Sequence, residues 1–189
     1  MRLLYESVFP VLWIGFLLYW NVMAAQTKST ERMEPTASRV LRALVFLAAI
    51  YLLCAPWQFA WLNTHLWQTT ALIFWVGAGI TLAGLLFCVW ARVHLGQNWS
   101  RSVTIKQDHE LIVTGPYSLV RHPIYTGLFV AFIGTALVIG QVRAVVAYAM
   151  IVLSLWYKLR LEEKWMRAQF GAKYEEYSSH VSAVVPFVF

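Results

Sequence analysis

The sequence predicts an all-α integral membrane protein of about five transmembrane helices, with a C-terminal helical hairpin and a cytoplasmic cap helix. Three observations predict this class. The chain of 189 residues is 60% hydrophobic and only 13% charged, whereas soluble domains carry about a quarter charged residues. Its apolar runs reach the length of a bilayer span. The basic residues gather between and after those runs, which is typical of membrane topology.

Four apolar regions set the helix count, because backbone groups in lipid must be paired within the protein and helices achieve this. Residues 8–25, 40–62 and 71–93 each predict one helix. The first is interpreted as a retained helix, since its apolar stretch is long and no clear small-residue cleavage site follows. Residues 124–157 exceed the ~20 residues of one span. Gly140–Arg143 interrupts them, so we predict two helices joined by a tight turn.

The loop charges predict the orientation. The connection at 61–70 has no Lys or Arg, whereas the other connections and the tail are basic. The positive-inside rule therefore places the basic connections and the C-terminus on the cytoplasmic side, with the N-terminus opposite. The basic residues concerned are Lys28, Arg32, Arg39, Arg42, Arg92, Arg101, Lys106 and Arg121. Arg143, at the hairpin turn, is the one exception.

Composition and spacing also exclude several functions. The net charge is +6, and the basic residues lie beside the apolar runs, where they suit anionic lipid headgroups. Nucleic-acid binding is not expected, because the sequence has no basic face with interleaved aromatic residues. The five histidines show no HxxxH spacing, so no metal site is expected. Cys54 and Cys88 are interpreted as small buried hydrophobic residues. Gly77, Gly79 and Gly84 are predicted to be close-packing positions between helices.

The stretch GPYSLVRHPIYTG, residues 115–127, opens the fourth apolar region with polar residues. Pro123 suits the first turn of a helix, where its missing N–H costs nothing. Arg121 and His122 then lie at the helix start, beside unpaired N–H groups that attract a carboxylate or phosphate. The alternative is interfacial anchoring, with Arg and His at the headgroups and the tyrosines in the aromatic belt.

A second polar segment, residues 158–180, follows the last apolar run. On a helix, Glu162 shares a face with Leu155 and Leu159 and so interrupts an apolar stripe. The pairs Lys158–Glu162 and Arg160–Glu163 could be ordinary surface ion pairs worth a few tenths of a kcal/mol. Charges at the mouth of a membrane helix favour a functional role instead. This segment and the first polar segment, residues 94–123, both lie on the predicted cytoplasmic side and are expected to meet in one cap.

LGQNWS, HELIVTGPYSLVRHPIYTG and RLEEKWMRAQFGAKYEEY follow one another in this chain. Together they resemble the isoprenylcysteine carboxyl methyltransferase family of integral-membrane enzymes and its phospholipid-methyltransferase relatives. The resemblance covers roughly residues 94–186. It implies S-adenosylmethionine as methyl donor, bound in a cytoplasm-facing pocket made by the final hairpin and the C-terminal helix. It also implies a division into residues 1–93, with three N-terminal spans, and residues 94–189, a catalytic region with the cap and the last two spans.

The resemblance assigns site residues by position. Arg160 would be the acceptor-side catalytic residue, with Glu162 or Glu163 completing the site and Lys158 as a second candidate for the cationic role. The implied donor-binding residues are His109, Glu110, Leu111, Ile112, Tyr117, Arg121, His122, Pro123 and Ile124.

The chemistry of the donor agrees with these residue types. Its carboxylate suits Arg121 and His122, its amino group suits a Glu, and its sulfonium suits an aromatic face such as Tyr117 or Trp156. Methyl transfer is an in-line displacement, so catalysis would consist mainly of alignment and water exclusion. A carboxylate acceptor needs no base. A thiol or an amine would need His122 or Glu162 as a base.

The sequence therefore predicts a methyltransferase acting on a lipophilic, membrane-partitioned acceptor. Its other expected partners are membrane lipids, and neither nucleic acid nor a metal ion is expected to bind. The favoured acceptor is the carboxylate of an isoprenylcysteine-like small molecule or prenylated protein terminus. Alternatives within the class are a phospholipid amine and a small thiol. A sterol-reductase-type enzyme using NADPH fits RHPIYTG less well. A non-enzymatic membrane scaffold leaves the co-occurrence of RHPIYTG and RLEE unexplained.

Overall fold

The computed structural model describes residues 2–24, 30–33, 35–54, 59–96, 104–106 and 111–188. Its helices are α1 (Arg2–Ala24), α2 (Thr36–Cys54), α3 (Ala71–Leu95), α4 (Pro123–Ile139), α5 (Val142–Phe170) and α6 (Ala172–His180), with short 3-10 helices η1 (Ala60–Asn63) and η3 (Gly115–Ser118). Two short strands, β1 (Thr30–Met33) and β2 (Thr104–Lys106), pair antiparallel. The predicted helical membrane class is confirmed, and this small strand pair is an addition to it.

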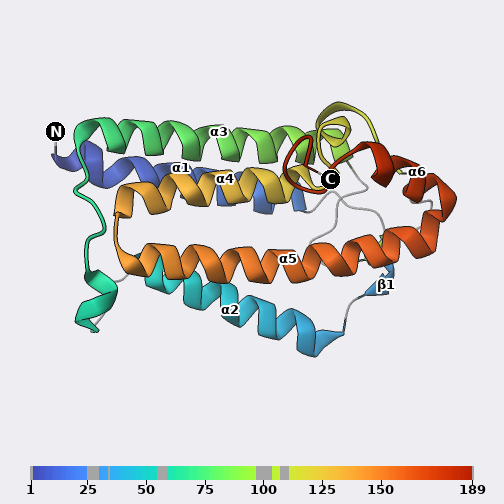
Figure 1. Ribbon diagram of the computed structural model, residues 1–189, viewed down its shortest axis with the longest axis horizontal. Coiled ribbons are helices and arrows are strands. Elements are labelled where there is room, and N and C mark those ends of the chain that lie inside the picture. Colours follow the sequence, from blue (N-terminus) through green and yellow to red (C-terminus); the bar gives the residue numbers. More distant parts are fainter. Residues whose placement is uncertain are drawn as a thin grey trace.

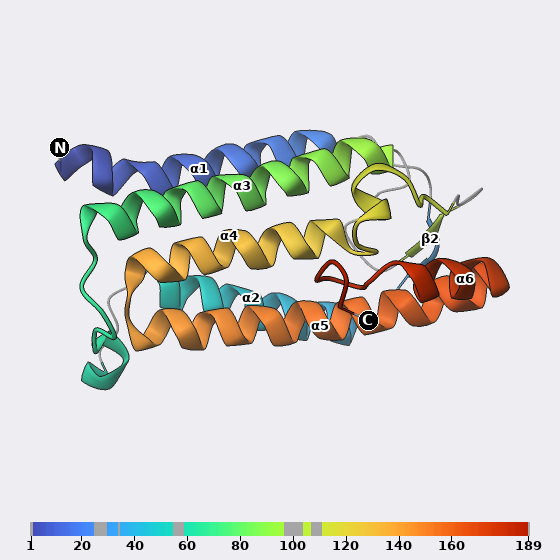
Figure 2. The same ribbon diagram turned by 45° about the horizontal axis from the view of Figure 1, so that its top comes forward.

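The long helices run nearly side by side (Figures 1 and 2). Within the described ranges, α1, α2, α3 and α5 are long and apolar enough to cross a membrane. The remaining long helix, α4, has 17 residues. Its length is therefore about 25 Å, which is shorter than the ~30 Å thickness of a hydrocarbon core. α3 and α4 form the closest pair, while α2 packs mainly on α5 and α1 on α3.

Several predicted boundaries differ from the structure. The first helix begins at Arg2 rather than near residue 8, and the second begins at Thr36 rather than near residue 40. The second helix ends at Cys54 rather than near residue 62, and residues 60–63 form η1 instead. The last long helix does not end near residue 157 but continues to Phe170. The residues from 158 to 170 include several good helix formers and no Gly or Pro. The helix stops only at Gly171, whose φ of 51° suits glycine.

Small residues allow the close approach of α3 and α4. A Cβ added to Gly134 would lie 2.5 Å from the carbonyl oxygen of Gly77, and one added to Gly84 would lie 2.5 Å from that of Gly127. The close-packing interpretation is therefore confirmed for Gly77 and Gly84. It is wrong for Gly79, which has no described neighbour within 4 Å of an added Cβ because it lies on another face of α3.

The hairpin turn explains the one exception in the loop charges. Arg143 Nη1 donates to the carbonyl oxygens of Leu52 and Leu53 at 2.7 and 2.8 Å. These carbonyls belong to the last turn of α2, where intrahelical partners run out. Arg143 therefore satisfies the end of a neighbouring helix, a structural role that the charge rule does not consider.

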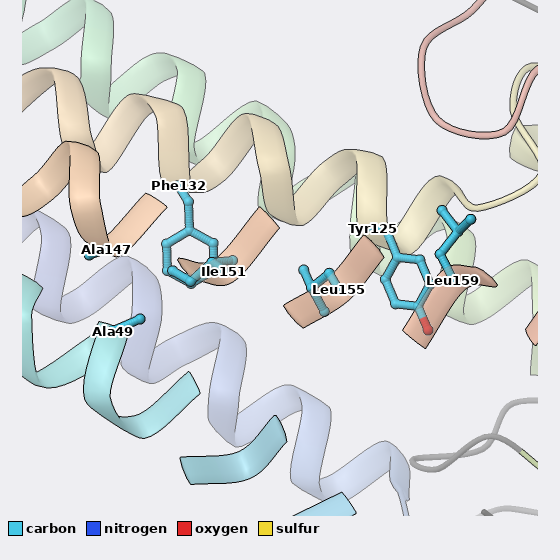
Figure 3. Close-up of a cluster of buried hydrophobic side chains, with 7 residues drawn as sticks. All are labelled: Ala49, Tyr125, Phe132, Ala147, Ile151, Leu155 and Leu159. Carbon is cyan, nitrogen blue, oxygen red and sulfur yellow. The ribbon is translucent and has the colours of Figure 1, made fainter. Parts of the chain in front are cut away.

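A buried cluster joins α4 to α5 and α2 (Figure 3). Phe132 projects from α4 and is 2% exposed, while Ala49 of α2 and Ala147 of α5 are fully buried near it. The small alanines leave room for the ring. Tyr125, Ile151, Leu155 and Leu159 continue the cluster toward the polar end of the molecule.

Except for η1, which lies in the α2–α3 connection, the short elements outside the bundle gather at one end. β1, β2, η3 and α6 lie there, whereas the N-terminus, the α2–α3 connection and the α4–α5 turn lie at the other (Figure 1). The two polar segments of the sequence therefore meet in one cap, as the charge pattern predicts.

Candidate active site

The start of α4 is held by main-chain hydrogen bonds to the C-terminal segment, residues 181–188. The Arg121 N–H donates to the Ser182 carbonyl at 2.8 Å, and the His122 N–H donates to the Ala183 carbonyl at 2.9 Å. The Thr126 hydroxyl donates to the Val184 carbonyl at 2.7 Å. Donors at a helix start that would otherwise seek water are thereby paired, and the cap is fixed against the bundle.

Arg121 forms a buried clamp with Glu163. Its Nε and Nη2 donate to Glu163 Oε1 at 2.9 and 2.5 Å, and the two side chains are 10% and 6% exposed. Its Nη1 donates to the carbonyl oxygens of Ser178 and Val181. One guanidinium therefore joins α4, α5 and the end of α6, as a planar five-donor group can.

His122 lies between the two neighbouring carboxylates. Its Nδ1 is 3.7 Å from Glu162 Oε2 and its Nε2 is 3.4 Å from Glu163 Oε1. Burial alone would lower the pKa of this imidazole, but the two carboxylates outweigh burial and raise the pKa above its ordinary value. The charged imidazolium is thus favoured at the N-terminal end of α4.

Glu162 is the centre of a second group of contacts. The Tyr125 hydroxyl donates to Glu162 Oε1 at 2.5 Å. Lys158 Nζ lies 3.8 Å from the same oxygen and 5.4 Å from the centre of the Tyr125 ring. The Lys158 ammonium therefore has both a carboxylate and an aromatic face as neighbours.

Tyrosines from η3 and α6 cover this region. The Tyr177 hydroxyl donates to the Tyr117 carbonyl at 2.5 Å. Burial raises the pKa values of Tyr117, Tyr174 and Tyr177. All three phenols therefore stay protonated at neutral pH, and the Tyr177 hydroxyl is a hydrogen-bond donor.

These groups open onto a cavity of about 1320 Å³. Its polar end holds side chains from the cap, α4, α5 and α2, and the remainder is an apolar slot between α1, α2, α4 and α5. The polar-end residues are Arg39, Arg42, Tyr117, Arg121, His122, Tyr125, Lys158, Glu162, Tyr174 and Tyr177.

All of the predicted donor-binding residues that the structure describes line this cavity: Leu111, Ile112, Tyr117, Arg121, His122, Pro123 and Ile124. His109 and Glu110 lie outside the described residues. Glu162 lines the cavity, whereas Glu163, which is buried in the clamp, is not among its described lining residues.

Arg160 lies apart from the predicted site. It is exposed on α5 and is not among the described lining residues. Lys158 and Glu162, four residues apart, share a helix face, and Arg160, midway between them, points elsewhere. The cation that α5 contributes to the cavity wall is therefore Lys158, whose side chain is 15% exposed.

Sequence reasoning missed Arg39 and Arg42 on α2, which it treated as charges that set the orientation. Both line the polar end. Their spacing of three residues places them near one another on a helix, but the same signal fits contact with headgroups. Only the packing of α2 on α5 brings them toward Glu162.

The part of the chain from α3 to α5 also matches a known family. Residues 75–168 match the sequence profile of the isoprenylcysteine carboxyl methyltransferase (ICMT) family. The resemblance that the motifs predict is therefore confirmed. The match begins inside α3 and ends in α5, so it includes the Arg121–Glu163 clamp and the two ionisable residues Lys158 and Glu162 on the cavity face of α5.

Relatives of the family share part of their length with this chain. A protein-S-isoprenylcysteine O-methyltransferase of Schizosaccharomyces pombe is 31% identical over 52% of this chain and 43% of its own length. Methanethiol S-methyltransferase 2 of Bradyrhizobium diazoefficiens is 28% identical over 77% of this chain and 59% of its own length. The chain thus spans less than two thirds of either relative.

A solved structure of the family supports the fold. The eukaryotic intramembrane Ras methyltransferase ICMT superposes with a TM-score of 0.53 at 25% sequence identity, covering 81% of this chain and 52% of that chain. The family architecture therefore extends beyond the matched motifs to most of the helical bundle.

Proposed function

We propose that this protein is an S-adenosylmethionine-dependent methyltransferase that methylates the carboxylate of an isoprenylcysteine-like acceptor. One observation carries the proposal: a single cavity joins a polar chamber of ionisable side chains to an apolar slot between membrane helices. A soluble polar donor and a lipophilic acceptor can meet only where such environments are continuous. The family supports the same reaction.

The residues at the polar end fit the donor. Leu111 and Ile112 supply apolar wall, Glu162 supplies an acceptor for an amino group, and the rings of Tyr117 and Tyr125 supply faces for a cation. The guanidinium of Arg121 is engaged by Glu163 and by carbonyl oxygens. We assign the donor carboxylate to the neighbouring His122, which lines the cavity at the start of α4. S-adenosylmethionine, when bound, supplies a methyl group on a positively charged sulfur.

The residues of the chain would hold the acceptor and exclude water. We assign the acceptor carboxylate to Lys158, and Arg160, the candidate from sequence, is the alternative that its exposure disfavours. Arg39 and Arg42 add positive charge to the same wall. A carboxylate is ionised at neutral pH, so no general base is needed. Its alignment and the exclusion of water would then provide most of the rate.

The two regions of the chain would divide the work. Residues 94–189 would supply the donor pocket, and residues 1–93 would supply most of the apolar wall through α1 and α2. The cap end would face the cytoplasm, where the donor is made available, in agreement with the positive-inside rule.

A small thiol is the second candidate acceptor. The relative named methanethiol S-methyltransferase 2 matches 77% of this chain, more than the relative of Schizosaccharomyces pombe does. A thiol must lose its proton, and Glu162 or His122 would act as the base. A small thiol leaves the long apolar slot without a use, so the prenylated carboxylate is favoured.

The test is methyl transfer by the purified protein. Labelled S-adenosylmethionine is supplied with a prenylcysteine, a phospholipid amine or a small thiol, and calorimetry compares binding of S-adenosylhomocysteine with NADPH. We expect transfer to the prenylcysteine carboxylate and binding of S-adenosylhomocysteine alone. Transfer to the thiol alone would select the second candidate. Binding of NADPH would indicate a reductase. Absence of methyl transfer together with absence of binding of either ligand would indicate a scaffold.

Two variants test which cation of α5 binds the acceptor carboxylate. Lys158→Gln should lower transfer by roughly a hundredfold or more, since a charge-assisted contact to the acceptor is lost. Arg160→Gln should lower it much less. The reverse order would return the acceptor-side role to Arg160.

A further inference from the structure

The cavity continues well past the polar chamber, and three aromatic rings meet across it. Trp13 comes from α1, Phe132 from α4 and Phe46 from α2, and all three line the cavity. Trp13 and Phe46 lie in the first two helices, which precede the residues that match the family.

The rings form a contiguous row. Trp13 stacks on Phe132 with ring centres 4.5 Å apart and planes inclined by 29°. Phe46 meets Phe132 edge to face, with centres 6.0 Å apart. Trp13 is also fixed by a hydrogen bond, because its Nε1 donates to Thr135 Oγ1 at 3.1 Å. Phe132 is held by burial beside Ala49 and Ala147 (Figure 3).

This row lies midway along the slot. Phe132 is seven residues after Tyr125 on α4, which places it about 10 Å from the chamber along the helix axis. The cavity continues beyond the row to Pro10, Leu53, Cys54 and Ile139. Ile139 is about 21 Å from Tyr125 along the same axis. The slot therefore has a compartment beside the chamber and a second compartment beyond the rings.

We propose that the Trp13–Phe132–Phe46 row limits how far the apolar chain of the acceptor reaches into the slot, and so selects acceptors by chain length. The inference rests on the proposed function, because the chamber places the polar end of the acceptor. A chain that fills the first compartment gains contact with each added carbon. A longer chain must displace Trp13 and break its stacking and its hydrogen bond.

The test is a binding series that does not depend on turnover. N-acetyl-S-alkyl-cysteines with chains from hexyl to eicosyl are titrated by calorimetry into the full chain in detergent, with S-adenosylhomocysteine present and absent. In the wild type we expect affinity to rise by up to about fourfold per methylene and then to stop rising at one chain length. In Trp13→Ala the rise should continue to longer chains.

Two further variants make the result specific. Phe46→Ala removes the ring on the other side of Phe132 and should also move the chain length at which affinity stops rising. This variant keeps the test usable if Trp13→Ala fails to fold. Trp90→Ala is the matched control, because Trp90 is an exposed ring of α3 in edge contact with Phe87 and is not among the described lining residues. Partition of the ligands into detergent is common to all variants and cancels in their ratios.

The outcomes separate this inference from the proposed function. An affinity that rises without a limit in the wild type, or a limit that stays fixed in both variants, would overturn the role of the rings. A limit that moves in the variants, while no acceptor is methylated, would keep the chain-binding role and remove the methyltransferase. A limit that moves equally in Trp90→Ala would also overturn it.

Discussion

The adjacent residues Glu162 and Glu163 have different roles because they point in different directions from α5. Glu163 is buried against Arg121, whereas Glu162 faces the cavity with Tyr125 and Lys158. Successive residues on a helix point about 100° apart, so one carboxylate can hold the cap while its neighbour meets a ligand.

Removing the clamp should cost stability. Glu163→Ala leaves the buried Arg121 guanidinium without its carboxylate, and loss of one partner of a buried pair costs on the order of 3 kcal/mol. We expect a clearly lower Tm in detergent. Glu162→Gln should lower the Tm less than Glu163→Ala does and should reduce binding of S-adenosylhomocysteine. A larger loss of stability in Glu162→Gln would contradict this division.

The pH dependence of stability should report on His122. Its pKa is raised in the folded protein because the effect of Glu162 and Glu163 outweighs burial, and the unfolded value is about 6.5. A raised folded pKa gives stabilisation that is complete below the unfolded pKa and is lost as pH rises through the folded pKa.

The Tm advantage of the wild type over His122→Gln should therefore shrink as pH rises above the unfolded value of about 6.5. Thermal unfolding at a series of pH values measures it. An advantage that grows with pH would mean that the folded protein disfavours the imidazolium. His180→Gln is the control, since His180 is exposed at the end of α6.

At the scale of the helices, α3 and α4 form a rigid base for the site. Their glycines bring two backbones together, and Thr81 of α3 donates a hydrogen bond to the Ala131 carbonyl of α4 at 3.1 Å. The start of α4 carries His122 and its middle carries Phe132. Close packing of this pair therefore fixes both the polar chamber and the ring row.

A methyl group in this interface should separate the two helices. In Gly134→Ala the new Cβ would lie 2.5 Å from the Gly77 carbonyl oxygen, so backbone must shift, and overpacking of this kind costs about 1–3 kcal/mol. Gly79→Ala is the matched control on α3, with no described atom within 4 Å of the new carbon. Thermal unfolding should show a lower Tm for the first variant alone. Equal Tm values would indicate a looser interface.

At the scale of the whole molecule, the C-terminal segment closes the cap. Residues 182 to 184 accept hydrogen bonds from Arg121, His122 and Thr126 at the start of α4. A segment far away in sequence thus fixes the helix start that carries the predicted donor-binding residues.

Removal of this segment should affect the cap and spare the bundle. A chain ending at residue 180 should still enter the membrane through its long apolar helices. It should lose binding of S-adenosylhomocysteine by calorimetry, because the start of α4 loses its partners. A chain lacking only residues 187–189 is the control, since Phe187 and Val188 are exposed. Unchanged binding of S-adenosylhomocysteine by the chain that ends at residue 180 would show that the cap does not need the C-terminal segment.

Much of this architecture follows from local properties of the sequence. Apolar runs of span length require helices in lipid, and Gly140 and Gly171, both with positive φ, mark the ends of α4 and α5. The order of GPY, RHPIYTG and RLEE gives the family and the donor-binding candidates, and all of the described candidates line one cavity. The end of the last long helix was missed because polarity at residue 158 does not end a helix.

Other features depend on which helix face meets which neighbour, and composition does not encode that. Periodicity leaves open whether Lys158 or Arg160 faces the cavity, and whether Glu162 or Glu163 joins the clamp, until the position of α4 against α5 is known. The roles of Arg39, Arg42 and Trp13 need contacts between α1, α2 and α4. The sequence by itself determined the helices and the chemistry available to them. The tertiary structure alone decided which side chains share a chamber, because long-range packing selects one face of each helix.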